Sequence, residues 1–154
     1  QLDYQLPGRF NLEYVGADGE KHCPVVIHRV VFGSIERFIG VITEHFAGAF
    51  PVWLSPVQAV VMPITDRVND YAEEVTAKLN DLGFRVESDL RNEKIGYKIR
   101  EAQLKKMPYM LVVGDKEKES GCVAVRTRTG VDLGAMPLDD FISRLREEVD
   151  TMAK

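Results

Sequence analysis

Features that would point to several protein classes are missing from this sequence of 154 residues. It has only two cysteines, Cys23 and Cys122, and their wide separation argues against a disulfide framework. A reducing cytosol therefore fits best. No apolar run approaches the roughly 20 residues that a membrane-spanning helix needs. The N-terminus has no basic segment followed by an apolar one, which gives no support for secretion. We therefore expect a cytoplasmic protein with no membrane partner.

The glycine and nucleophile patterns of many enzymes are missing as well. The sequence contains neither a Walker glycine loop nor a Rossmann glycine pattern, and no Ser/His/Asp arrangement stands out. The chain starts at Gln1 without an initiator methionine, and we expect it to be a fragment or a processed form of a longer protein. A composition of 45% hydrophobic and 29% charged residues is typical of a globular chain with room for one domain, or one domain plus a piece of another.

Basic side chains are outnumbered by acidic ones, 20 to 24, but they are concentrated in one stretch. The chain has a formal net charge of −4, whereas residues 91–128 contain ten basic and five acidic side chains, a local charge of +5. A local basic face can bind phosphate even on an acidic protein. The alternative is a solvated helix face whose lysines serve solubility. The charge pattern alone leaves both interpretations open.

The first third of the chain has its own pattern of elements. Residues 10–16 alternate between apolar and polar, as in a half-buried strand, and an Asp-Gly turn at 17–20 favours a hairpin. Residues 24–32 are almost all apolar and predict a strand buried on both faces. Ser34 is a suitable N-cap for a helix with a buried apolar stripe that ends near Gly48.

A second pattern begins at about residue 56 and predicts a compact α/β domain. Alternation of strand and helix implies parallel strands, and a terminal hairpin implies an antiparallel edge, so we expect a mixed five-stranded sheet in the order βαβαβββα. The predicted strands are 57–64, 84–88, 109–113, 122–128 and 131–136, and the predicted helices are 69–82, 93–106 and a last one that opens at Pro137. The predicted domains are therefore 1–51 and 56–154, joined by a short apolar linker that we expect to be packed.

Two candidate functional positions lie in the first part. Arg37 falls in the first turn of a helix, where the unpaired N–H groups and the helix dipole attract anions, and Ser34 lies beside it. The alternative for Arg37 is a surface residue paired with a neighbouring glutamate. His28 lies in the middle of an apolar strand, so it is either a hydrogen-bonded core histidine or a metal ligand, for which zinc is a common partner.

Three more candidates lie in the second part. Asn92 follows a strand end and is either the N-cap of the next helix or an amide that reads a base, because it offers a donor and an acceptor. Glu117 on a predicted loop and Arg126 on a predicted strand are ordinarily solvated charges. A carboxylate and a guanidinium are also the groups that read base edges.

The sequence resembles a known family at several places along its length. Residues 28–38 resemble motif 3 of class II aminoacyl-tRNA synthetases. Together with further segments they are similar to bacterial threonyl-tRNA synthetases, over nearly the whole chain. Those further segments are 1–3 and 46–51 in the first part, and 89–96, 108–117 and 123–128 in the second.

The resemblance implies a role for each candidate in the first part. It makes His28 the last of three protein ligands to a zinc ion that holds the amino and hydroxyl groups of threonine. It makes Gln1, Ser34 and Arg37 contacts of ATP or the adenylate, with Arg37 as a catalytic residue against adenine and ATP used with magnesium. Residues 1–51 would then be a strand-hairpin-helix remnant of the antiparallel class II catalytic domain.

The resemblance also implies an RNA partner for the second part. Residues 56–154 would form a class IIa anticodon-binding domain, in which Asn92, Glu117 and Arg126 contact anticodon bases of tRNA-Thr. The intact protein would be a homodimeric threonine–tRNA ligase. Because motifs 1 and 2 and the other zinc ligands do not occur in this sequence, we expect no catalysis by the chain alone. A non-catalytic tRNA-binding module and a paralogous class IIa ligase, such as a prolyl or histidyl enzyme, are the alternatives.

Overall fold

The computed structural model describes residues 1–153, which divide between Ile42 and Thr43 into two compact units. The sequence places the boundary some ten residues later, between 51 and 56, and that boundary stays a prediction. None of the helices within the described residues has the length and apolar character needed to cross a bilayer.

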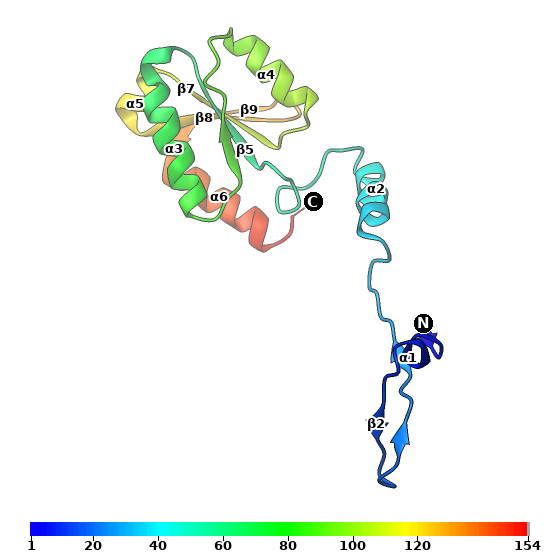
Figure 1. Ribbon diagram of the computed structural model, residues 1–154. Helices are drawn as coiled ribbons and strands as arrows, with labels where there is room; N and C mark the ends of the chain where they lie inside the picture. The colour runs from blue at the N-terminus through cyan, green and yellow to red at the C-terminus, as the bar shows by residue number, and fades with distance from the viewer. Residues whose placement is uncertain (154) are drawn as a thin grey trace. The chain divides into compact units, whose positions relative to one another are not determined.

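The first unit contains strands of only two residues each, with helices and loops between and after them (Figure 1). A hairpin joins β2 to β3 around a turn in which Gly19 has a φ of 79°, so the predicted Asp-Gly turn is confirmed. Strands β1 and β4 pair antiparallel, with Leu2 opposite Ile27. The elements are β1 (Leu2–Asp3), α1 (Leu6–Arg9), β2 (Tyr14–Val15), β3 (Lys21–His22) and β4 (Val26–Ile27).

The predicted strands of this unit are only partly right. The strand expected over 10–16 exists only near its end, because the chain is still turning after α1: Asn11 has a φ of 50° and the Leu12 N–H donates to the Pro7 carbonyl at 2.9 Å. The strand expected over 24–32 is reduced to two residues, and its expected burial is wrong, since Val31 is 77% exposed. An apolar run becomes a doubly buried strand only where neighbours cover both faces. Within the described residues, β4 has β1 alone as its partner.

Helix α2 (Ile35–His45) begins and ends where the sequence predicts. The Ser34 hydroxyl accepts a hydrogen bond from the Arg37 N–H at 3.2 Å, which confirms the cap. Beyond the helix, Ala47 and Gly48 take φ values of 49° and 74° and end it. The apolar stripe is present but not buried, because none of the described α2 side chains is buried. Spacing fixes which face of a helix is apolar, whereas burial depends on a packing partner.

The second unit is built on the predicted mixed sheet of five strands. The spatial order is β6-β5-β7-β8-β9, in which β5 runs parallel to both β6 and β7, and β8 runs antiparallel to β7 and β9. The connections through α3 (Asn69–Asp81) and α4 (Ile95–Leu104) produce the parallel part, and the terminal hairpin of β8 and β9 produces the antiparallel edge. The strands are β5 (Ala59–Pro63), β6 (Val86–Ser88), β7 (Tyr109–Val113), β8 (Cys122–Thr127) and β9 (Asp132–Pro137).

Helices cover the two faces of this sheet unequally. Helices α3 and α6 pack on one face and α4 on the other (Figure 1). Helix α5 is an addition to the predicted order, and α4 begins two residues later than predicted, because Lys94 is still extended with ψ of 134°. The helices are η1 (Asp66–Val68), α3 (Asn69–Asp81), α4 (Ile95–Leu104), α5 (Asp115–Ser120) and α6 (Leu138–Asp150).

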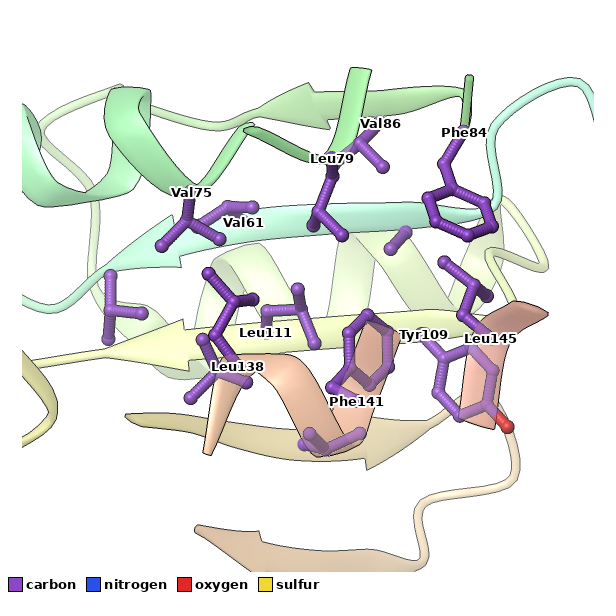
Figure 2. Packing of buried hydrophobic residues seen from close by; sticks show 14 of the residues in the cluster. Val61, Val75, Leu79, Phe84, Val86, Tyr109, Leu111, Leu138, Phe141 and Leu145 are labelled. Atoms are coloured by element: carbon purple, nitrogen blue, oxygen red, sulfur yellow. The ribbon is translucent and has the colours of Figure 1, made fainter. Parts of the chain in front are cut away.

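The core lies in two layers, one on each side of the sheet. Val75 and Leu79 of α3 and Phe141 of α6 meet Val61 and Leu111 of the central strands (Figure 2). The smaller layer under α4 contains a group of four buried residues, Val60, Met62, Ala102 and Met110. Consecutive residues of β5 and β7 therefore enter opposite layers, which explains why both strands are continuous apolar runs in the sequence.

Candidate nucleic-acid interface

The C-terminal ends of β6, β5 and β7 lie side by side at one end of the sheet, which we call its carboxyl edge. Two backbone hydrogen bonds continue the ladders there, from Asp89 N–H to Val61 C=O at 2.8 Å and from Ile64 N–H to Val113 C=O at 2.9 Å. In open α/β sheets, ligands bind at such carboxyl edges. Asn92 follows β6 and Glu117 follows β7, so the topology places these two predicted residues at the same edge, on either side of the β5 end.

Asn92 lies exposed in the loop between β6 and α4. The cap interpretation is wrong, because the residue at the N-cap position of α4 is Lys94 and not Asn92. Instead Asn92 lines a pocket of about 210 Å³ together with Ile64 and Thr65, which follow β5. Ile64 is an exposed apolar side chain beside these polar groups. The amide is thus presented at the carboxyl edge with its donor and acceptor available to a ligand.

Two cations brace the loop that carries Asn92. The Arg91 guanidinium donates to both carboxylate oxygens of Asp89, at 2.9 and 2.7 Å, and to Glu101 of α4 at 2.5 Å. The hydrogen bonds from Arg91 hold the pKa of the Asp89 carboxyl below its usual range, and those from Asp89 and Glu101 raise the pKa of Arg91. Lys98, also on α4, donates to the backbone carbonyl of Asp89. Residue types and spacing gave no prediction for these bracing residues.

Glu117 is placed on a helix and not on the predicted loop. It lies in the first turn of α5, and its Oε2 accepts a hydrogen bond from the Gly114 N–H at 2.9 Å, as the glutamate of a capping box does. A Cβ at position 114 would stand 3.1 Å from Ile64 Cδ1 and 3.0 Å from Glu117 Oε2. Glu117 is therefore fixed against the end of β7 before any ligand arrives.

Arg126 lies on β8, as predicted, but away from the other two candidates. It stands opposite Met110, near the start of β7, and so on the face that α4 covers. From Met110 to Val113 the strand rises by about 10 Å, so Arg126 is at least that far from the carboxyl edge along the sheet. Its guanidinium pairs with Asp132 of β9 at 2.6 Å, with both side chains partly exposed. The three candidates line an extended surface and not a single pocket.

The sheet between Arg126 and the carboxyl edge is incompletely covered. Residues Val112 and Ala124 stand opposite each other on the α4 side, and Ala124 stands opposite Ala135 of β9. Ala124 is partly exposed and Ala135 exposed, whereas Met110 under α4 is buried. Small side chains on an open strand face leave room for a flat, bulky group beside the guanidinium.

The basic block presents fewer available cations than its charge suggests. Arg91, Lys118 and Arg126 form ion pairs and Lys98 is buried. Within residues 1–153, the other six cations of the block form no ion pair, so they are the ones suited to phosphate. They are Lys94, Arg100, Lys105, Lys106, Lys116 and Arg128.

Comparison with known proteins decides the family of this domain. The family model described as "Anticodon binding domain" matches residues 58–148, which include β5 to β9 and all three candidates. The chain belongs to the anticodon-binding domain family. This confirms the fold predicted from the resemblance.

Similarity to individual proteins extends beyond the anticodon-binding domain into the first unit. The chain is 65% identical over 149 residues to a threonine–tRNA ligase of Acetivibrio thermocellus, and 64% identical over 149 residues to one of Desulforamulus reducens. Each alignment covers 97% of this chain and 24% of the relative. The chain thus spans about a quarter of the length of these relatives.

Solved structures contain the same fold. The RNA binding domain of threonyl-tRNA synthetase from Cryptosporidium parvum matches with a TM-score of 0.74 and 41% identity, over 96% of this chain and 38% of that one. Prolyl-tRNA synthetase from the same organism matches with a TM-score of 0.66 over 97% of this chain and 32% of that one, but at 21% identity this likeness is one of fold alone.

The capping role of Glu117 in the anticodon-binding domain leads to a stability prediction. Glu117→Ala is expected to lower the free energy of unfolding by about 1 kcal/mol, because the Gly114 N–H loses its acceptor. Glu117→Gln keeps an oxygen that can accept and is expected to cost less. Urea unfolding followed by circular dichroism measures both. Glu119→Ala, an exposed change in the same helix, is the control and should stay within about 0.5 kcal/mol.

In the first unit, the predicted residues Gln1 and His28 lie side by side. The N-terminal amine of Gln1 donates to the His28 carbonyl at 3.1 Å, and the His28 N–H donates to the Gln1 carbonyl at 2.9 Å. The His28 side chain is 45% exposed, so the interpretation as a core histidine is wrong. Its Nε2 lies 3.6 Å from an oxygen of Asp3. Among the described residues, no group of three or more His, Cys, Asp or Glu side chains is placed to hold a metal.

Ser34 caps α2 and Arg37 lies in its first turn, as predicted. The Ser34 hydroxyl donates to Glu36 at 3.0 Å and accepts from the Arg37 backbone, which leaves the Arg37 side chain on the exposed surface. Arg37 makes no ion pair with residues 1–153, so its interpretation as half of a surface pair with glutamate is not supported. The guanidinium is available to a ligand at this helix end.

Proposed function

We propose that this chain is part of a threonine–tRNA ligase and that its second unit reads the anticodon of tRNA-Thr. The observation that carries the proposal is the identity of 60–65% to threonine–tRNA ligases over at least 97% of the chain, which includes both units. A free-standing tRNA-binding module would account for the family of the second unit, but it gives no reason for the similarity of the first.

The chemistry of the interface supports base recognition. The Asn92 amide donates and accepts, the Glu117 carboxylate accepts from amino groups, and the Arg126 guanidinium donates two parallel hydrogen bonds or stacks on a base. Single-stranded loops suit such a surface, because their splayed bases can spread over about 10 Å of sheet. The six cations outside ion pairs supply phosphate contacts that are independent of base sequence.

For the first unit we propose a contribution to amino-acid activation in the whole protein. Gln1, Ser34 and Arg37 would contact ATP, used with magnesium, or the adenylate. His28 is accessible, and a nearby carboxylate such as Asp3 is the usual partner of a metal-bound imidazole, so it fits the role of one zinc ligand. The remaining ligands would come from elsewhere in the longer protein. When bound, zinc would hold the amino and hydroxyl groups of threonine. We further propose a homodimer that works in the cytoplasm.

Binding of the 154-residue chain to tRNA-Thr, at a stated salt concentration, tests the proposal. Changing the central anticodon base is expected to weaken binding by about 1–3 kcal/mol, or roughly 5- to 150-fold, because a misread base leaves buried polar groups unpaired. A tRNA changed in its acceptor stem is the control and should bind this chain as well as the native tRNA. Equal binding of all three RNAs, with one common salt dependence, would mean that the surface recognises phosphate alone and would contradict anticodon reading.

A further inference from the structure

Lys98 is a buried cation that the proposed contacts with RNA do not use. It lies on α4 and is 3% exposed. Its ammonium donates to the Asp89 carbonyl at 2.9 Å and to the Pro63 carbonyl at 3.3 Å. Burying an ammonium group is costly unless its donors are satisfied. These two hydrogen bonds therefore account for its place under the carboxyl edge of the sheet.

The two carbonyls belong to neighbouring parallel strands at the points where the strands separate. Pro63 ends β5, and Asp89 follows β6 directly, with its own N–H still bonded to Val61. Beyond these residues, β5 leads into η1 and β6 leads into the loop 90–94. Lys98 thus links the ends of β5 and β6 to α4, beyond the last hydrogen bond of the ladder between these two strands.

The loop between Asp89 and α4 carries Asn92 and is held at both ends by the same helix. Its end continues into α4, and its start is bonded to Lys98 of that helix. Arg91 adds a second link from within the loop, to Glu101 one turn further along α4. Asn92 is therefore presented on a short segment that is tied to α4 through both Lys98 and Arg91.

We propose that Lys98 is a positioning residue for anticodon reading: its ammonium fixes the loop so that the Asn92 amide meets its base in one orientation. This inference rests on the proposed function. A hydrogen-bonding group displaced by about 1 Å loses its directional contact, whereas phosphate attraction hardly changes over that distance. Loss of Lys98 should thus reduce discrimination between bases more than it reduces overall affinity.

Three variants of the full chain separate positioning from charge. Lys98→Met removes the charge and both hydrogen bonds. Lys98→Arg keeps the charge, but its larger, planar guanidinium fits between the two carbonyls only if the strand ends or the loop shift. Lys105→Met removes one exposed charge from the same stretch and leaves the loop intact. Dissociation constants are measured at one salt concentration for tRNA-Thr and for three tRNAs, each changed at one anticodon base.

We expect both Lys98 variants to lose about 10-fold in discrimination at one anticodon position, with discrimination at the others unchanged. Lys105→Met should weaken all four RNAs by one common factor. In the RNA-free chain, amide hydrogen exchange at 90–93 should speed up in both Lys98 variants, while exchange in β7 stays as in the unmodified chain. Thermal unfolding shows which variants are folded, and Lys98→Arg carries the test should Lys98→Met fail to fold.

Two results would overturn the inference. Full discrimination by Lys98→Arg, with Lys98→Met weakening all RNAs equally, would reduce Lys98 to a source of charge. Unchanged exchange at 90–93 in a folded Lys98 variant would show that the loop does not depend on it. Failure of the unmodified chain to discriminate at any anticodon position is a different outcome, because it contradicts the proposed function itself and removes this role with it.

Discussion

Replacing Phe141 by alanine is expected to lower the free energy of unfolding of the second unit by about 3–5 kcal/mol. Phe141 is fully buried at the centre of the larger core layer. Its ring meets that of Tyr109 edge to face, with centroids 5.4 Å apart, and both rings lie between α6 and the sheet (Figure 2). Alanine would remove this contact and leave a cavity that the surrounding strands fill only partly.

Urea unfolding followed by the far-ultraviolet signal measures the effect. Ser143→Ala, an exposed change two residues along the same helix, is the matched control and should stay within about 0.5 kcal/mol. A loss of less than about 1 kcal/mol for Phe141→Ala would mean that α6 does not pack on the sheet in solution, in conflict with the structure.

Replacing Arg126 by methionine is expected to weaken binding of tRNA-Thr by about 5- to 150-fold, which corresponds to the 1–3 kcal/mol that a bidentate base contact supplies. The unfolding free energy should change by less than about 1 kcal/mol, because the ion pair with Asp132 is half exposed. The two measurements together separate a reading residue from a structural one.

Asp132→Asn is the control for Arg126→Met, since it breaks the same ion pair while it leaves the guanidinium in place. We expect it to bind tRNA-Thr at least as well as the unmodified chain, because the competing carboxylate is gone. If both variants lose affinity equally, the ion pair and its effect on the β8–β9 hairpin matter, and Arg126 does not contact RNA directly.

The fold of the second unit was largely predictable for two reasons. Its helices and strands are marked by local sequence patterns, and the elements that pack against them lie within this chain. Apolar runs such as 109–113 and the stop at Gly83 predict elements whose neighbours this chain supplies. Helix α5 escaped prediction because six mostly charged residues have no apolar period. In the first unit the same reasoning predicted burial at Val31 that does not occur. The spacing of apolar residues indicates which face of a helix or strand is apolar, whereas burial of that face requires another element that packs against it.

The candidate interface was predictable by residue type but not by arrangement. Asn92 and Arg126 lie on the expected loop and strand, but their separation along the sheet depends on register, which sequence spacing does not give. Lys98 had one signal that could have singled it out. It stands three residues after Ile95 and four before Ala102, so a lysine occupies the core-facing stripe of α4. A cation at such a position must have buried acceptors.

The hydrogen bond between Glu117 and Gly114 limits how the specificity of this domain can evolve. If Glu117 reads a base as proposed, a substitution that removes its side-chain acceptor also uncaps α5, so a single mutation would change recognition and stability together. A second mutation at Gly114 cannot easily restore a cap, because a side chain there would meet Ile64 at 3.1 Å. A prior change at Ile64 would relieve this contact, so under the proposed reading role the order of mutations would matter as well as their identity.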